Sequence, residues 1–267
     1  MANKIHLLVI DGQFDFCDPR GALYVPGADE DMKRLSEMIK KAGDKIGNIS
    51  ATLDTHRKVH IAHPIWWVDP DGNHPDPFTQ ISLEDVVGSK PTWFSFNPDY
   101  QERSIDYVKK LKQNGRYTLT IWPPHCLLGS NGHKVFTELY DAFDTWEDHL
   151  RGVSYTIKGF NMFTEHYSAV KADVEDPSDM TTGLNSFFIS SINASDTVVI
   201  AGEALSHCVA NTIRDVADEI GEGGIKKLVL LEDASSSVPG FEDEGKKFIK
   251  ELKGLGMQLS KTTEFPG

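Results

Sequence analysis

The sequence is poor in cysteine, has no basic cluster and contains no long hydrophobic run, and each shortage excludes a class of protein. Its three cysteines, Cys17, Cys126 and Cys208, lie far apart without C-x-x-C spacing, so we expect neither a disulfide framework nor a structural zinc knuckle. The 27 basic and 40 acidic residues give a net charge of −13 spread along the chain, which argues against nucleic acid or a membrane surface as a partner. No apolar run approaches the roughly 18 residues of a membrane span, and the first run is too short for a signal peptide. We therefore expect a cytoplasmic protein.

The rest of the composition is that of an ordinary globular protein. With 267 residues, 39% hydrophobic and 25% charged, the chain can bury a full core, and we expect a single domain over residues 1–267. Apolar runs typical of buried strands occur at Ile5–Ile10, Ile49–Leu53, Tyr117–Ile121, Ser154–Ile157, Thr197–Ala201 and Lys227–Leu231. Segments typical of helices occur at Asp29–Lys45, Ser104–Lys112, Lys134–Asp148, Glu165–Val174, Leu184–Ser191, Val209–Ile220 and Glu242–Lys253. This alternation predicts an α/β fold, with an open, mostly parallel six-stranded sheet and helices on both faces.

One segment breaks the alternation of strands and helices. Residues 63–98 are rich in proline, aspartate, glycine and aromatic side chains, and we interpret them as an insertion. Long surface segments form lids and binding edges, or they contact another subunit. Both interpretations stay open at this stage, and the second would give a homo-oligomer.

Chemically active side chains follow several of the apolar runs. Ligands of an open α/β sheet bind beyond the carboxyl ends of its strands, which makes these residues candidates for one site: Asp11, Asp54, His56, His125, Lys158 and Cys208. Each residue alone is weak support. A carboxylate after a strand is often a cap, a lysine there is usually a solvated end, and a lone histidine is usually structural.

Cys208 lies where an apolar strand turns into a predicted helix. A thiol in the first helical turn feels the positive end of the helix dipole, which favours the thiolate and lowers the pKa. Ser206 is a candidate cap for that helix. These features suit a nucleophile, but a small cysteine that fills a corner of the core would have the same sequence pattern.

Taken together, the candidate residues belong to motifs that occur in one order along the chain. These motifs are Asp11-Gly12-Gln13-Phe14-Asp15-Phe16, Gly21-Ala22-Leu23, Val25-Pro26-Gly27, Asp54-Thr55-His56, Trp122-Pro123-Pro124-His125-Cys126, Lys158-Gly159-Phe160, Tyr167-Ser168-Ala169, and Gly202-Glu203-Ala204 ahead of Cys208-Val209. In these motifs the chain resembles the nicotinamidases, within the isochorismatase-like superfamily of cysteine hydrolases. Departures from the family pattern occur at Thr55, at Ala62 and His63, and at Ser206, outside the implied triad and metal ligands.

The resemblance implies a catalytic triad of Asp11, Lys158 and Cys208. Asp11 would act as the general base and then as the acid, while Lys158 would favour the charged forms of both partners. The backbone N–H groups of Ala204 and Cys208 would form the oxyanion hole. In the family, the peptide bond that precedes this alanine is cis, which gives a structural test.

The resemblance also implies a metal site made by Asp54, His56 and His125. A carboxylate and two imidazoles suit one divalent ion, zinc first, with manganese and iron as alternatives. The family uses the open coordination positions for water and for the pyridine nitrogen of the substrate. His60 matches a flanking position of the family, and His63 reads as an ordinary loop residue.

The implied reaction is the hydrolysis of nicotinamide to nicotinate and ammonia in NAD salvage, and pyrazinamide is a further candidate substrate. Phe16 and Trp122 match aromatic residues that line the nicotinamide ring, although core packing beside a strand end would explain them equally. The alternatives are another amide hydrolase of the same superfamily, an iron oxygenase that uses Asp54, His56 and His125, and a non-catalytic binding module.

Overall fold

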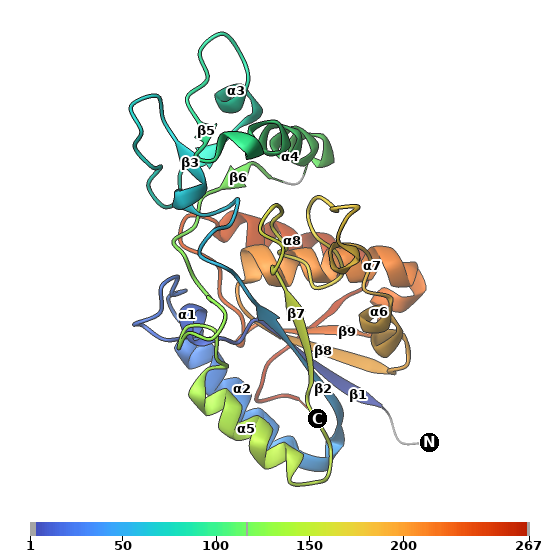
Figure 1. Cartoon of the computed structure of the whole chain (residues 1–267). Helices are drawn as coiled ribbons and strands as arrows, with labels where there is room; N and C mark the ends of the chain where they lie inside the picture. The colour runs from blue at the N-terminus through green and yellow to red at the C-terminus, as the bar shows by residue number, and fades with distance from the viewer. Residues whose placement is uncertain (1–3, 116, 266–267) are drawn as a thin grey trace.

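The computed structural model describes residues 4–115 and 117–265 and has a six-stranded sheet at its centre (Figure 1). The strand order is β10-β9-β8-β1-β2-β7, and every neighbouring pair is parallel. The strands span Ile5–Ile10 (β1), Ile46–Asp54 (β2), Ser154–Lys158 (β7), Thr197–Gly202 (β8), Leu228–Leu231 (β9) and Gln258–Ser260 (β10). The predicted fold class is confirmed.

The central strands owe their place to continuous apolar runs. The sequences IHLLVI, TVVIAG and LVLL form β1, β8 and β9, and nearly all of their side chains are buried. A strand that is apolar at every position can only be satisfied when both faces of the sheet are covered. Helices provide that cover here.

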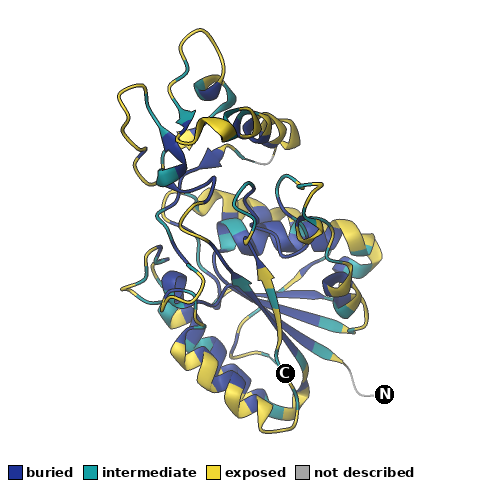
Figure 2. Ribbon diagram, viewed as in Figure 1, coloured by how far each residue is buried: buried dark blue, intermediate teal, exposed yellow. Residues whose placement is uncertain are grey.

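Two groups of helices lie against the two faces of the sheet (Figure 1). On one face α2 (Ala28–Ala42) packs along α5 (Thr137–Glu147), and on the other lie α6 (Ser186–Asn193), α7 (Ala210–Ile225) and α8 (Glu242–Leu255). Buried residues of α2 recur three and four positions apart, as an amphipathic helix requires. Figure 2 shows the consequence, with buried inner faces and exposed outer faces on these helices.

A smaller group of elements stands outside the central sheet, at the top of Figure 1. It contains β3 (Trp67–Val68) paired with β5 (Phe94–Ser95), β4 (Gln80–Ile81) paired with β6 (Leu119–Thr120), and the helices α3 (Leu83–Val86) and α4 (Gln101–Asn114). Trp66 and Trp67 are buried in this outlying group, whereas Phe78 and Phe96 are exposed. The Nε1 of Trp66 donates to the Ser104 Oγ at 3.0 Å, and its ring stacks on Tyr100.

The remaining helices are short. They are α1 (Phe14–Cys17), the 3-10 turns Gly43–Lys45, Pro64–Trp66, Pro98–Tyr100 and Met180–Thr182, and a π-helical turn at Leu205–Val209. Within the described residues, no helix has both the length and the apolar character needed to cross a membrane.

Two secondary-structure predictions are wrong. The run Tyr117–Ile121 does not enter the central sheet, because β6 pairs antiparallel with β4, and the sixth strand is instead β10. Apolar character marks a strand but does not select its partner, and the short Gln258–Ser260 carries little apolar signal. The segment Glu165–Val174 is irregular rather than helical.

Local side-chain bonds explain the irregular segment. The Glu165 Oε1 accepts from the backbone N–H of His166 at 2.9 Å, and the Ser168 Oγ accepts from the backbone N–H of Val170 at 3.0 Å. Such bonds compete with the hydrogen bonds of a helix. The chain therefore folds as a loop over the sheet edge.

Candidate active site

The register of the parallel sheet brings the predicted residues to one edge. Asp54 and Lys158 are directly opposite each other at the ends of β2 and β7. Ile10 lies opposite Gly202 at the ends of β1 and β8, so Asp11 and the loop that leads to Cys208 start side by side. Because the four strands are neighbours in the sheet, side chains from four distant segments meet at one rim.

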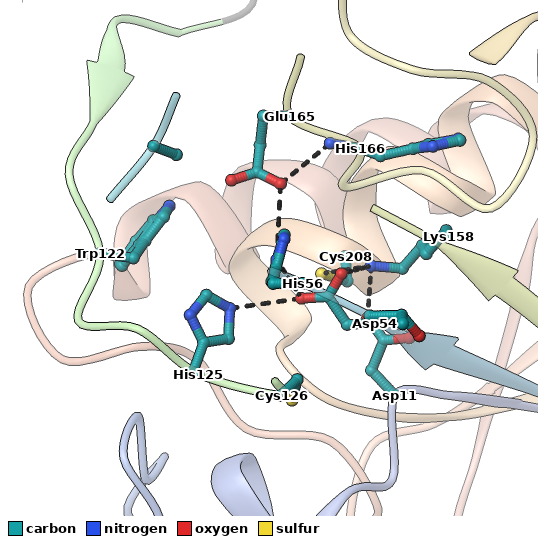
Figure 3. A network of polar contacts seen from close by, with 12 residues as sticks. Asp11, Asp54, His56, Trp122, His125, Cys126, Lys158, Glu165, His166 and Cys208 are labelled. Atoms are coloured by element: carbon teal, nitrogen blue, oxygen red, sulfur yellow. Dashed lines mark hydrogen bonds and ion pairs between the residues drawn. The ribbon is translucent and has the colours of Figure 1, made fainter. Parts of the chain in front are cut away.

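The ammonium group of Lys158 points toward Asp11, Asp54 and Cys208 (Figure 3). Its Nζ is 2.7 Å from the Asp11 Oδ2, 3.2 Å from the Asp54 Oδ1 and 3.5 Å from the Cys208 Sγ. All four side chains are buried. The three residues of the expected triad therefore lie in contact range, and the same ammonium group contacts one of the expected metal ligands.

Burial dominates the electrostatics of Cys208. It raises the pKa of the thiol well above its ordinary value, and the nearby Lys158 lowers it by less. The expected depression of the pKa is therefore wrong for this structure. The thiol is therefore neutral at rest.

Asp11 and Lys158 form a buried ion pair beside Cys208. Burial raises the pKa of Asp11, an effect that Lys158 opposes. Burial alone would lower the pKa of Lys158, but Asp11 and Asp54 raise it more, so that its pKa lies well above the ordinary value. The neutral thiol thus has a fixed ammonium group beside it, and the same group contacts Asp11.

The backbone around Cys208 differs from the predicted helix start. Cys208 belongs to the π-helical turn that precedes α7, and Ser206 does not cap a helix. The Ser206 Oγ instead accepts from the backbone N–H of Val238 at 3.1 Å. The peptide bond between Glu203 and Ala204 is cis, as expected.

Two glycines allow the strand ends to approach one another. At Gly202, with a φ of +118°, a Cβ atom would lie 2.0 Å from the backbone oxygen of Ile10. At Gly159, with a φ of +80°, it would lie 2.7 Å from the Asp54 Oδ1 and 3.1 Å from the His56 Cε1. Any side chain at either position would push the candidate residues apart.

Thr52 holds Asp11 in place and was missed by the sequence analysis. Its Oγ1 donates to the Asp11 Oδ1 at 2.5 Å and accepts from the Asp11 backbone N–H at 3.0 Å. Asp11 has a φ of +45°, which is unusual for a residue with a side chain. The double contact fixes this conformation, and a polar residue inside the buried strand β2 was the only signal for it.

Asp54, His56 and His125 form a compact set of donor atoms. The Asp54 Oδ2 is 3.0 Å from the His56 Nε2 and 3.3 Å from the His125 Nε2, and all three side chains are buried. One donor atom from each residue lies within 4.8 Å of the others. One carboxylate and two imidazoles that converge in this way fit a divalent ion.

The charges in this set also favour a cation. Burial would raise the pKa of Asp54, but His56 and Lys158 lower it well below its ordinary value, so the carboxylate is ionised. The pKa of His56 is raised, because Asp54 offsets the effect of burial. The negative charge of Asp54 therefore favours positive charge at this place.

The other two histidines of the motif are both buried. His60 is fully satisfied by the backbone, because its Nε2 faces the Thr164 oxygen at 3.2 Å and its Nδ1 accepts from the Ala62 N–H at 3.2 Å. The interpretation of His63 as an ordinary loop residue is wrong. It is fully buried, and its ring centroid lies 5.2 Å from that of His56.

Glu165 is a second residue that the sequence analysis missed. Its Oε1 lies 3.9 Å from the His56 Nε2, and its side chain is buried (Figure 3). The helix predicted over Glu165–Val174 gave no reason to place Glu165 beside the histidines. Its place two residues before the matched Tyr167-Ser168-Ala169 was the signal that could have found it.

Phe16 and Trp122, the two aromatic residues predicted to line the substrate, each contact a histidine ring. The ring of Phe16 contacts that of His125 edge to face at 5.3 Å. The Nε1 of Trp122 donates to the Tyr167 hydroxyl at 2.7 Å, and its ring contacts His207 at 5.2 Å. A cavity of about 550 Å³ is lined by Ser206, His207 and Tyr167 together with residues of the outlying group.

Comparison with known proteins supports the predicted resemblance. No family model matches the chain. The nicotinamidase of Saccharomyces cerevisiae is 28% identical over 230 residues, which cover 85% of each chain. The chain therefore resembles nicotinamidases, as the motifs predict.

Solved structures support the same fold. The yeast nicotinamidase bound to the inhibitor nicotinaldehyde matches with a TM-score of 0.67 and 21% identity, over 96% of this chain and 99% of that one. An Acinetobacter baumannii nicotinamidase and pyrazinamidase matches with a TM-score of 0.66 and 22% identity, over 98% of both chains. A pyrazinamidase of Pyrococcus horikoshii in complex with zinc matches with a TM-score of 0.58 and 21% identity, over 97% and 99% of the two chains.

Proposed function

We propose that this chain is a cysteine amidohydrolase of the isochorismatase-like superfamily, a nicotinamidase that converts nicotinamide and water to nicotinate and ammonia in NAD salvage. The sequence relative from yeast carries the same activity in its name. One observation supports the assignment above the others. A single buried ammonium group, Lys158 Nζ, contacts Asp11, Asp54 and Cys208 at 2.7, 3.2 and 3.5 Å, so that the nucleophile and the substrate-holding residues form one unit.

The first chemical step transfers a proton from Cys208 to Asp11. The Cys208 thiol is neutral at rest because burial raises its pKa, and the sulfur becomes nucleophilic as it loses this proton. Lys158 offsets the negative charge that appears on the sulfur. The sulfur then attacks the amide carbon of the substrate.

The same proton then leaves with the nitrogen. Asp11 returns it to the amide nitrogen as the C–N bond breaks, so that ammonia departs and a thioester to Cys208 remains. Asp11 next accepts a proton from the attacking water, whose oxygen adds to the thioester carbon as the C–S bond breaks. Asp11 gives this proton to the departing sulfur, which regenerates the thiol, and the nicotinic acid formed releases its own proton to solvent as nicotinate.

We assign the oxyanion hole to the backbone N–H groups of Ala204 and Cys208. Both belong to the turn that leads from β8 to α7, beside the reacting sulfur. Backbone donors fixed in a buried turn stabilise a developing oxyanion without moving during the reaction. Their rigidity is the contribution that the fold makes here.

We further propose that Asp54, His56 and His125 hold one divalent ion, zinc first, with manganese and iron as alternatives. The zinc in the similar pyrazinamidase supports this choice. Such an ion would supply a Lewis acid for the pyridine nitrogen, which selects nicotinamide over a simple amide. Phe16 and Trp122 would line the ring, and nicotinaldehyde in the similar yeast structure supports a pyridine ligand. A cytoplasmic location and a homo-oligomer remain predictions from the sequence.

A comparison of nicotinamide with benzamide tests the proposal. Benzamide keeps the ring size and the amide but lacks the pyridine nitrogen. We expect the zinc-loaded protein to release ammonia from nicotinamide with a kcat/KM at least about 100-fold above that for benzamide, because a site built for one polar contact rejects the analogue without it. If protein of verified zinc content releases no ammonia from nicotinamide, the assignment is wrong.

A further inference from the structure

We propose that His63 is an additional nitrogen donor of the metal centre, beside Asp54, His56 and His125. The family motif does not lead to this residue, since His63 occupies one of the positions where the sequence departs from the pattern. The proposal rests on the proposed metal site but not on the substrate.

The hydrogen bonds of His63 fix which of its nitrogens is available. The Nδ1 faces the backbone oxygen of Lys58 at 3.1 Å, and since a carbonyl oxygen can only accept, the Nδ1 carries the proton. The Nε2 is then a bare lone pair. It is buried and has no hydrogen-bond partner among the described residues.

Burial makes this free lone pair significant. The His63 ring is fully buried beside the rings of His56 and His125. A buried acceptor without a partner is unfavourable, so a cation or a donor is expected to face the Nε2 of His63.

His63 shares a cluster of donor atoms with His56, one of the proposed metal ligands. Its ring contacts His56 at 5.2 Å and His125 at 5.8 Å, in both cases edge to face. One ring nitrogen from each of His56, His60 and His63 lies within 4.8 Å of the other two. His56 thus joins this histidine cluster to the set formed by Asp54 and His125.

His60 is the natural comparison within the cluster. It is equally buried, but both of its nitrogens are engaged with backbone groups at 3.2 Å. It could bind an ion only by breaking one of these bonds. Of the two histidines that follow His56 in the motif, only His63 has a nitrogen without a partner in the described structure.

Nitrogen NMR of the intact protein tests the proposal without any mutation. The ¹⁵N resonances of the imidazole nitrogens are recorded in metal-free protein and during zinc addition. We expect the Nε2 signals of His56, His125 and His63 to shift together at one equivalent of zinc, and the His60 signals to stay in place. The proposal is wrong if the His63 Nε2 signal does not shift on zinc addition while the signals of His56 and His125 do.

A matched pair of variants gives a second measurement. His63→Phe keeps a flat aromatic ring, which is one atom larger, and removes the nitrogen donor. His166→Phe is the control, because His166 is also a buried histidine with an unpartnered Nε2 and a pKa lowered to about 3 by burial, but it lies outside both donor groups.

The zinc dissociation constant is measured by competition with a chromophoric chelator, and the absorption spectrum is recorded with cobalt in place of zinc. Loss of a residue that supports a metal ligand typically weakens binding 10–100-fold, so we expect His63→Phe to weaken zinc binding about 10–100-fold and to change the cobalt spectrum. His166→Phe should change neither.

The proposal is contradicted if folded His63→Phe binds zinc with the same affinity as wild-type protein. A protein that binds zinc in this way but does not hydrolyse nicotinamide would contradict the proposed function alone.

Discussion

Lys158 lies directly opposite Asp54 in the ladder between β7 and β2, and its Nζ is 3.2 Å from the Asp54 Oδ1. The same Nζ is 2.7 Å from the Asp11 Oδ2. One buried cation is therefore shared by the proposed general base and by a proposed metal ligand. A change at either carboxylate alters the electrostatic environment of the other.

Lys158→Met should abolish turnover while zinc binding is retained or becomes tighter. Removal of the ammonium leaves Asp11 without its ion-pair partner, and breaking a buried ion pair in this way costs about 3–5 kcal/mol of unfolding free energy. A zinc ion would offset part of that cost by binding Asp54. The measurements are kcat with nicotinamide and urea unfolding with and without zinc. Full activity in this variant would contradict the role of Lys158.

Cys208→Ala should lower kcat by about 10⁴-fold or more, because the nucleophile is lost while binding remains. Cys17→Ala is the matched control, since Cys17 is also a buried free thiol. We expect Cys17→Ala to change stability slightly and kcat little. Equal losses of activity in the two variants would mean that Cys208 acts only through packing.

His125→Ala should lower the zinc content measured by elemental analysis and raise the KM for nicotinamide, since the proposed ion holds the ring. His149→Ala is the control, because His149 is a surface histidine with about half of its side chain exposed. Its zinc content and KM should equal those of wild-type protein. Stoichiometric zinc in His125→Ala would refute the proposed ligand set.

Thr52→Val should lower kcat with little change in KM, because Asp11 loses both contacts that fix its unusual backbone conformation. The buried Asp11 N–H is left without this acceptor, which costs about 1–3 kcal/mol of stability. Thr120→Val in β6 serves as control, since the Oγ1 of Thr120 makes only a 3.4 Å contact to its own segment. Steady-state kinetics and thermal unfolding measure both effects. A kcat equal to that of wild-type protein would show that Asp11 is positioned without Thr52.

His6 should make the protein less stable as the pH falls from 6.5 to 4. Burial lowers the pKa of His6 from 6.5 to about 4, so in this range the unfolded chain binds a proton that the folded protein does not. The free energy of unfolding therefore falls with falling pH, by about 3 kcal/mol for this residue. Urea unfolding of His6→Gln across the same range, in the presence of a chelator, should show a shallower decline. If stability declines with the same slope in His6→Gln and in wild-type protein, His6 is not the cause of the decline.

The sequence alone was sufficient for the α/β class, for most helices and for the candidate triad and metal ligands. Apolar runs and helical periodicity report the burial of each element, and the collinear motifs report the chemistry. The same signals failed at two places, one decided by a partner far along the chain and the other by local side-chain bonds. The run at Tyr117–Ile121 is apolar whether it pairs with β4 or with the central sheet, and the polar bonds of Glu165 override a helical pattern.

The tertiary structure alone decided the properties that depend on neighbours from other segments. The parallel register of β2 and β7 sets Lys158 against Asp54, and burial among these charges gives Cys208 a raised pKa where its position in the chain suggested a lowered one. Thr52 and His63 carry no motif, and their contacts arise only when β1 lies beside β2 and the histidine loop folds inward. Residue type and spacing fix which groups the chain has, but distance and dielectric environment, which set their reactivity, exist only in the folded molecule.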